Sequence, residues 1–131
     1  MSELYELNQA EFAAQFWQAA VDSGLFPASG VLLENPSTEA VFPCCVLSLP
    51  TARPKHFGHA YDLSITVEVW ANEQLEAVEL FEKLRRSLSA LNLRQTGNTP
   101  AQVDEITEKW RFGGYFEVRW NAIFNTFERN N

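Results

Sequence analysis

The chain has 131 residues, of which 46% are hydrophobic and 21% are charged, and its formal net charge is −7. This length and composition predict one globular domain over residues 1–131, large enough to fold without disulfides or a structural metal. The negative charge argues against a surface that attracts nucleic acid everywhere, but it is compatible with a local basic patch. No apolar run approaches the roughly 20 residues that cross a bilayer, so we expect no membrane partner.

The two cysteines, Cys44 and Cys45, are adjacent and lie in an apolar run. Neighbouring residues of a strand point to opposite faces, so these thiols are expected neither to bridge each other nor to share a metal. We interpret both as small buried hydrophobic residues. The segment Met1–Glu6 is acidic and lacks the basic start and apolar middle of a signal peptide, which favours a cytosolic protein.

In chain order, the first predicted element is a helix over residues 9–23. Asn8 can cap this helix, and Glu11 completes a capping box three residues later. Gly24 can adopt the left-handed conformation that ends many helices, and Pro27 prevents the helix from resuming.

Two strands are predicted in the segment that follows. Residues 42–49 form an apolar run bounded by prolines, which is typical of a short strand buried on both faces. Residues 61–70 alternate between apolar and polar side chains, which predicts a half-buried strand. Residues 51–60 between them are polar and basic, and we expect a hairpin loop there. A short extended piece is expected earlier, at residues 31–33.

A second helix, capped by Asn72 and running to about Leu91, is predicted because apolar residues recur at three- and four-residue spacing. The chain then closes with a predicted hairpin. Residues 106–112 and 115–125 alternate in polarity, and the pair Gly113–Gly114 between them is typical of a tight turn.

The predicted order of elements is α-β-β-α-β-β, with residues 92–100 as the loop before the closing hairpin. Hairpin connections make both strand pairs antiparallel. The simplest arrangement is an α+β fold in which a mostly antiparallel four-stranded sheet carries both helices on one face. The other face of this sheet mixes polar and aromatic side chains, and it is left free to meet a partner.

No motif for catalysis, phosphate binding or a nucleotide cofactor occurs in the chain. His56 and His59 are the only histidines, and a pair in a loop is a poor metal site. Cys45, His56 and Asp62 could be drawn as a nucleophilic site, but nothing in the sequence brings them together. We therefore predict no enzymatic activity, no cofactor, and no catalytic, cofactor-binding or metal-binding residues.

A basic cluster in the predicted loop supplies the first candidate contact residues, namely Arg53, Lys55, His56 and Phe57. Long loops often carry function, so this cluster indicates a contact with phosphate or with an acidic neighbour. A solvated hairpin loop without a partner is the alternative interpretation.

Charge is also segregated along the chain, because no Lys or Arg precedes Arg53. Arg85 and Arg86 continue the basic part on the second helix. Such asymmetry suits a head-to-tail contact between copies, which produces a ring if the rotation closes. We therefore expect Arg85 and Arg86 to take part in a contact between subunits.

Four segments follow the N-terminal helix: FPCCVLSL, YDLSITVEVW, LEAVELFEKLRRSLSALN and EKWRFGGYFEVRWNAIF. Together with that helix they cover nearly the whole chain. In size, in the order of these segments and in its aromatic-rich closing strand, the chain resembles the small tail terminator, or tail-completion, proteins of long-tailed bacteriophages and prophages.

This resemblance implies a homo-oligomeric ring, commonly a hexamer, that caps the finished tail tube, stops its polymerisation and joins the tail to the head. It implies tail-tube and head-neck proteins as partners, and a life in the host cytoplasm and then in the virion tail. DNA would pass through the lumen, and Arg53 and Lys55 are the expected contacts with the lumen or with a neighbouring subunit. A head-completion or neck connector, a minor tail protein, or a small-molecule-binding module that uses the concave sheet face are the alternatives.

Overall fold

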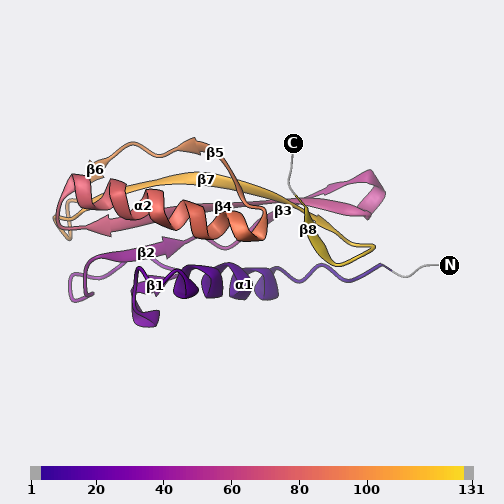
Figure 1. The fold of residues 1–131 in the computed structure, drawn as a ribbon, viewed down its shortest axis with the longest axis horizontal. Helices are drawn as coiled ribbons and strands as arrows, with labels where there is room; N and C mark the ends of the chain where they lie inside the picture. Colours follow the sequence, from indigo (N-terminus) through magenta and orange to yellow (C-terminus); the bar gives the residue numbers. More distant parts are fainter. Residues whose placement is uncertain (1–3, 129–131) are drawn as a thin grey trace.

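Two α-helices lie on one face of an eight-stranded mixed sheet in the computed structural model, which describes residues 4–128 (Figure 1). The helices and strands follow in the order α1 (Gln9–Asp22), β1 (Val31–Leu32), β2 (Cys44–Leu47), β3 (Thr51–Lys55), β4 (Ala60–Ala71), α2 (Gln74–Leu88), β5 (Arg94–Asn98), β6 (Gln102–Val103), β7 (Trp110–Asn121) and β8 (Thr126–Glu128). The fold is α+β, but the predicted four-stranded antiparallel sheet and its α-β-β-α-β-β order are wrong.

β4 and β7 form the centre of the sheet and pair antiparallel along their whole length, from Ala60 opposite Asn121 to Ala71 opposite Trp110. β2 and β3 pair with successive parts of β4, whereas β5, β6 and β8 pair with successive parts of β7. β1 runs parallel to β2 at one edge, which makes the sheet mixed. Each of the two long strands thus pairs with several short strands, so the sheet has more strands than the predicted four.

Helix α1 forms where the sequence predicts it, to within one residue at its C-terminal end. The Asn8 side chain caps it by accepting a 3.0 Å hydrogen bond from the Glu11 backbone N–H. Gly24 follows the helix with φ of 73°, the left-handed conformation that favours glycine. On its buried side, Phe12 packs against Trp120 with ring centres 5.0 Å apart.

The core lies between the helices and the inner face of the sheet. Helix α2 packs on β4 and β7, and it buries the four residues of its predicted apolar stripe that lie within the helix, Ala77, Phe81, Leu84 and Leu88. Phe81 meets Phe112 edge to face at 5.3 Å. Alternate residues of β4 and β7 supply the floor, so one face of each long strand is apolar and the other is polar.

The predicted closing hairpin is instead the single strand β7, in which the two glycines sit in the middle. A Cβ on Gly113 would lie 1.9 Å from the Val67 carbonyl oxygen, and one on Gly114 would lie 2.7 Å from the Gly97 carbonyl oxygen. The glycines therefore allow neighbouring backbones to approach closely, and no turn is made there.

Two predicted loops also contain strands. Residues 51–60 supply β3 and the first residue of β4, joined by a short 3₁₀ turn at His56–Gly58. Residues 92–100 supply β5, which pairs with β7 through a bulge between Gln95 and Gly97. Both strands lie on edges of the sheet and carry mostly polar residues, so they show no apolar alternation that would reveal them.

The predicted cap of the second helix is also wrong. Glu73 occupies the N-cap position, and the Asn72 side chain instead accepts a 2.6 Å hydrogen bond from Lys109 Nζ. Helix α2 ends at Leu88, and a 3₁₀ turn at Ser89–Leu91 completes the segment that the sequence assigns to one helix.

Candidate functional site

The helices cover one face of the sheet, and the opposite face carries two charged networks. In the first, Glu68 accepts two hydrogen bonds of 3.0 Å from Arg111. The Arg111 guanidinium also lies 4.9 Å from the centre of the Trp70 ring. Glu68 is only 8% exposed, so this network is largely withdrawn from solvent and serves the fold.

The second network surrounds Asp62, which is 5% exposed at the base of the β3–β4 hairpin. One carboxylate oxygen lies 3.8 Å from Arg53 Nη2 and 3.7 Å from Lys55 Nζ, and the other lies 3.4 Å from Arg119 Nε. Arg53 and Arg119 face Asp62 directly across β3 and β7. The predicted contact residues Arg53 and Lys55 therefore anchor a hairpin, and one anion among three cations leaves the hairpin with a positive surplus.

The tip of this hairpin carries the other two predicted contact residues. His56 and Phe57 both have left-handed backbones, with φ of 51° and 56°. The Phe57 side chain is fully exposed. The hairpin projects past the ends of both helices at one end of the molecule (Figure 1). The hairpin therefore presents a fully exposed aromatic ring on a base that is held by ion pairs.

Two further exposed aromatic residues lie beside the tip. The Ala122 N–H donates to the His59 carbonyl oxygen, and the Tyr5 N–H donates to that of Ala122, each at 2.8 Å. These bonds hold the N-terminal segment and the β7–β8 turn against the hairpin. Tyr5 is 55% exposed and Phe124 is 69% exposed. We call Tyr5, Phe57 and Phe124 the aromatic end.

Arg85 and Arg86 lie elsewhere, in the last turn of α2. With Arg94 and three neighbours they line a hollow of about 360 Å³. Arg85 pairs with Glu82 at 2.5 Å. Since Arg85 and Arg86 belong to the helix layer and Arg53 and Lys55 face the other side of the sheet, the six predicted contact residues divide between two surfaces.

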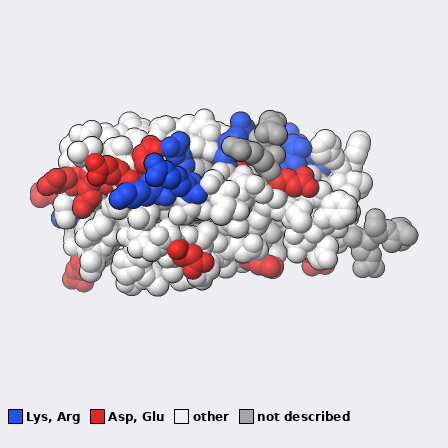
Figure 2. All heavy atoms as spheres, in the orientation of Figure 1, with Lys and Arg blue, Asp and Glu red and all other residues white. Residues whose placement is uncertain are grey.

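The helix layer shows this separation of charge directly. Figure 2 shows acidic atoms over the N-terminal end of α2 and basic atoms over its C-terminal half. This arrangement complements the helix dipole, which favours negative groups at the N-terminus and positive groups at the C-terminus. Stability of α2 thus accounts for part of the basic cluster, and the hairpin is the stronger candidate contact.

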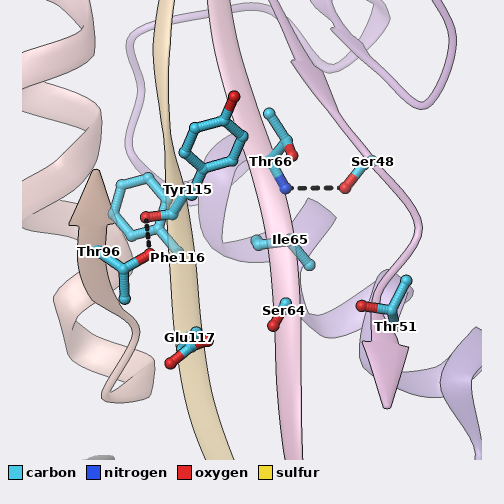
Figure 3. Close-up of a pocket in the computed structure, with 9 residues that line it drawn as sticks. All are labelled: Ser48, Thr51, Ser64, Ile65, Thr66, Thr96, Tyr115, Phe116 and Glu117. Carbon is cyan, nitrogen blue, oxygen red and sulfur yellow. Dashed lines mark hydrogen bonds between the residues drawn. The ribbon is translucent and has the colours of Figure 1, made fainter. Parts of the chain in front are cut away.

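A hollow of about 300 Å³ opens on the sheet face away from the helices (Figure 3). It is lined mainly by hydroxyl-bearing residues from neighbouring strands and loops: Ser48, Thr51, Ser64, Thr66, Thr96 and Tyr115. Two of these hydroxyls already bond to the backbone, because Ser48 accepts from the Thr66 N–H at 2.8 Å and Thr96 donates to the Tyr115 carbonyl at 3.3 Å. This hollow is the candidate site for the binding-module alternative.

An apolar groove lies between α1 and the strand edge. It has a volume of about 360 Å³ and is lined by Ala10, Ala13, Ala14, Trp17, Leu33 and Leu49. Two hydrogen bonds of 2.8 Å fix its walls, from Trp17 Nε1 to the Val31 carbonyl and from Gln9 Nε2 to the Pro50 carbonyl. The groove is therefore preformed. No sequence pattern predicts this groove, because its lining comes from three separate segments.

The cysteines lie far from the histidines. Both are fully buried, and burial raises the pKa of the Cys44 thiol to about 11 and raises that of Cys45 as well, with the neighbouring Cys44 adding to the effect. A protonated thiol is a poor nucleophile. Cys45 pairs with Val69 and His56 adjoins the other end of β4, so about 30 Å of strand separates them at ~3.3 Å per residue. The nucleophilic site that could be drawn from the sequence is not assembled.

Within residues 4–128, no group of three or more His, Cys, Asp or Glu side chains is placed to hold a metal ion. In the same part of the chain, no helix is both long and apolar enough to cross a membrane. Comparison with models of known protein families, and with curated proteins, finds no match.

Proposed function

We propose that this chain is a structural protein that assembles with copies of itself through its hairpin. Phe57 carries this proposal. A left-handed backbone costs a residue other than glycine roughly 1–2 kcal/mol. Within one copy the Phe57 ring is fully exposed, so no burial of its surface offsets that cost. Burial of the ring against a neighbour would contribute about 1.5–3 kcal/mol to assembly.

Within this class, a bacteriophage or prophage tail terminator is the specific role we propose. Such a protein would form a ring, of six copies in the simplest case, that caps the tail tube, stops its polymerisation and joins tail to head. The support is the resemblance of the segments that form α1, β2, β4, α2 and β7. The last of these is one long strand and not the hairpin that the resemblance was based on.

The assembly itself is tested by a charge placed on the hairpin tip. Phe57→Asp should convert the oligomer into a monomer in size-exclusion chromatography with light scattering, because a carboxylate cannot be buried at a subunit contact without a partner. Ile106→Asp is the matched control, since Ile106 is 80% exposed on a different turn. An oligomer that survives Phe57→Asp, or is lost equally in the control, would refute the role of the hairpin.

The tail role is then tested with its partners. A terminator should bind the end of polymerised tail tubes and stop their growth, so that added protein yields tubes of uniform length in electron micrographs. A head-completion or neck protein should bind heads and leave tube growth unchanged.

The binding-module alternative rests on the hydroxyl-lined hollow. Pockets for small molecules usually have volumes of about 300–1,000 Å³ and present free polar groups, whereas this hollow is at the lower end of that range and two of its hydroxyls already bond to the backbone (Figure 3). Strand alternation accounts for most of its hydroxyl-bearing residues, because it places polar side chains on the face that the helices leave open. The hairpin therefore supports assembly more strongly than the hollow supports a ligand.

A further inference from the structure

The apolar groove beside α1 is a site without a partner in the single copy. Its walls are almost entirely aliphatic or aromatic, and Leu33 and Leu49 on them are 46% and 63% exposed. Its volume of about 360 Å³ is at the lower end of the range found for ligand pockets, which suits one aromatic ring. Because hydrogen bonds fix both walls, no rearrangement is needed before something binds.

Phe57 is the most exposed residue of the aromatic end, and its ring has a shape that matches the groove. It is held away from its own groove, because the extended strand β3 lies between Leu49 and the tip and alone spans about 13 Å at ~3.3 Å per residue. Its base is anchored by Asp62, which keeps the hairpin pointing away from the body of the molecule. Phe57 can therefore reach a groove only on another copy.

The charges around the two features are opposite. The hairpin carries Arg53, Lys55 and two histidines next to Phe57. Exposed acidic residues adjoin two of the groove residues in the chain, since Glu11 follows Ala10 on α1 and Glu34 follows Leu33. No Lys or Arg occurs anywhere in the 52 residues that precede Arg53. Opposite charges on the rims of two complementary surfaces steer association and fix its orientation.

We propose that Phe57 of one copy docks into the groove formed by Ala10, Ala13, Ala14, Trp17, Leu33 and Leu49 of the next copy. This inference rests on the proposed self-assembly and names the surface that receives the hairpin. The two surfaces are different parts of the chain, so each copy gives one contact and receives another. Repetition of such a head-to-tail contact closes a ring when the rotation between copies allows it.

A mixture of two broken variants tests this pairing. Phe57→Asp removes the tip and keeps the groove, whereas Ala14→Glu fills the groove and keeps the tip. Ala14 is exposed on a helix, so glutamate there leaves the fold intact. Each variant alone should be a monomer, with self-association weakened at least about 30-fold. Mixed in equal amounts, they should form a dimer that grows no further, because only one intact tip and one intact groove remain.

Disulfide trapping gives a second readout. Cysteines placed at Phe57 and Ala14 in one chain should form disulfides between copies under mild oxidation, seen as a ladder on a non-reducing gel. A chain with cysteines at Ile106 and Ala14 is the control and should form none. The native thiols do not interfere, because both are fully buried.

The outcomes separate this inference from the proposed function. If Phe57→Asp yields a monomer while Ala14→Glu stays oligomeric, or if the mixture forms no dimer, the hairpin contacts a different surface and the docking inference is wrong. If the unmodified chain is a monomer at every concentration, both the inference and the assembly role are wrong.

Discussion

A missing side chain at Gly113 lets β4 and β7 lie together along their full length. The position that a Cβ would take is 1.9 Å from a backbone oxygen of β4, which cannot move without breaking the ladder. From the sequence, the same glycine pair indicates a turn, because tight turns are the commonest reason for adjacent glycines between alternating segments. At the residue scale, the sequence shows that a glycine is present, but the structural reason for it depends on which residues lie opposite it in the sheet.

Gly113→Ala should therefore lower the free energy of unfolding by about 3 kcal/mol or more, since the backbone must shift to accept a methyl group. Gly97→Ala is the control, because a Cβ there would meet only the Tyr115 side chain at 3.5 Å, and we expect a loss below about 1 kcal/mol. Urea unfolding in the Phe57→Asp background measures both without a contribution from assembly. Equal losses in the two variants would contradict the close approach of the strands.

At the scale of elements, the phase of alternation distinguishes the closing strand from a hairpin. A two-residue turn at the glycines would pair Phe112 with Tyr115 and place Phe112 on the same face as Glu117 and Arg119. A continuous strand places Phe112 on the face of Phe116, as observed. The apolar side chains keep one phase through the glycines, so the sequence contains the information, and only the turn interpretation hides it.

Other elements leave no such signal. β5 consists of Arg94, Gln95, Thr96, Gly97 and Asn98, and it is a strand only because β7 offers it an edge. The short β3 contains Pro54, which sequence rules assign to loops or edges. Helix α1, by contrast, is set by local capping and by its own apolar face, so the sequence alone predicts it.

The β3–β4 hairpin should depend on its buried carboxylate. Asp62→Asn keeps the shape and removes the charge that holds Arg53, Lys55 and Arg119 together. Because the Arg53 side chain is 70% exposed, water screens much of its attraction to Asp62. We therefore expect the substitution to lower the free energy of unfolding by about 1–2 kcal/mol.

The change at Asp62 should be local. Hydrogen exchange should quicken at the amides of β3 and stay unchanged at those of β2, which pairs with the opposite half of β4. Glu82→Gln, which breaks only an exposed ion pair on α2, is the matched control and should leave β3 unaffected. If the amides of β3 exchange no faster in Asp62→Asn than in the unmodified chain, the three cations do not anchor the hairpin.

At the scale of the whole molecule, the candidate surfaces differ in how far the sequence reveals them. The hairpin tip is a cluster of neighbouring residues, so its basic and aromatic character is visible before folding. The groove joins residues of α1 with Leu33 and Leu49, and the hydroxyl-lined hollow joins five segments of the sheet. Such surfaces form only when the chain has folded, which is why the hairpin tip can be predicted from the sequence and the groove cannot.

The distribution of charge along the chain also bears on assembly at this scale. Residues before Arg53 carry only negative charges, and they include the groove and its rim. The hairpin that follows is positive. A chain with opposite charges on two separate surfaces is favoured to associate head to tail and disfavoured from stacking like surfaces together.

The oligomeric state of the unmodified chain tests the central claim most directly. Sedimentation velocity across a hundredfold range of concentration should show one closed species of fixed stoichiometry, whose proportion falls in high salt as the charged rims are screened. A chain that sediments as a monomer throughout that range would contradict the account, because neither the exposed Phe57 nor the empty groove would then have a partner in another copy.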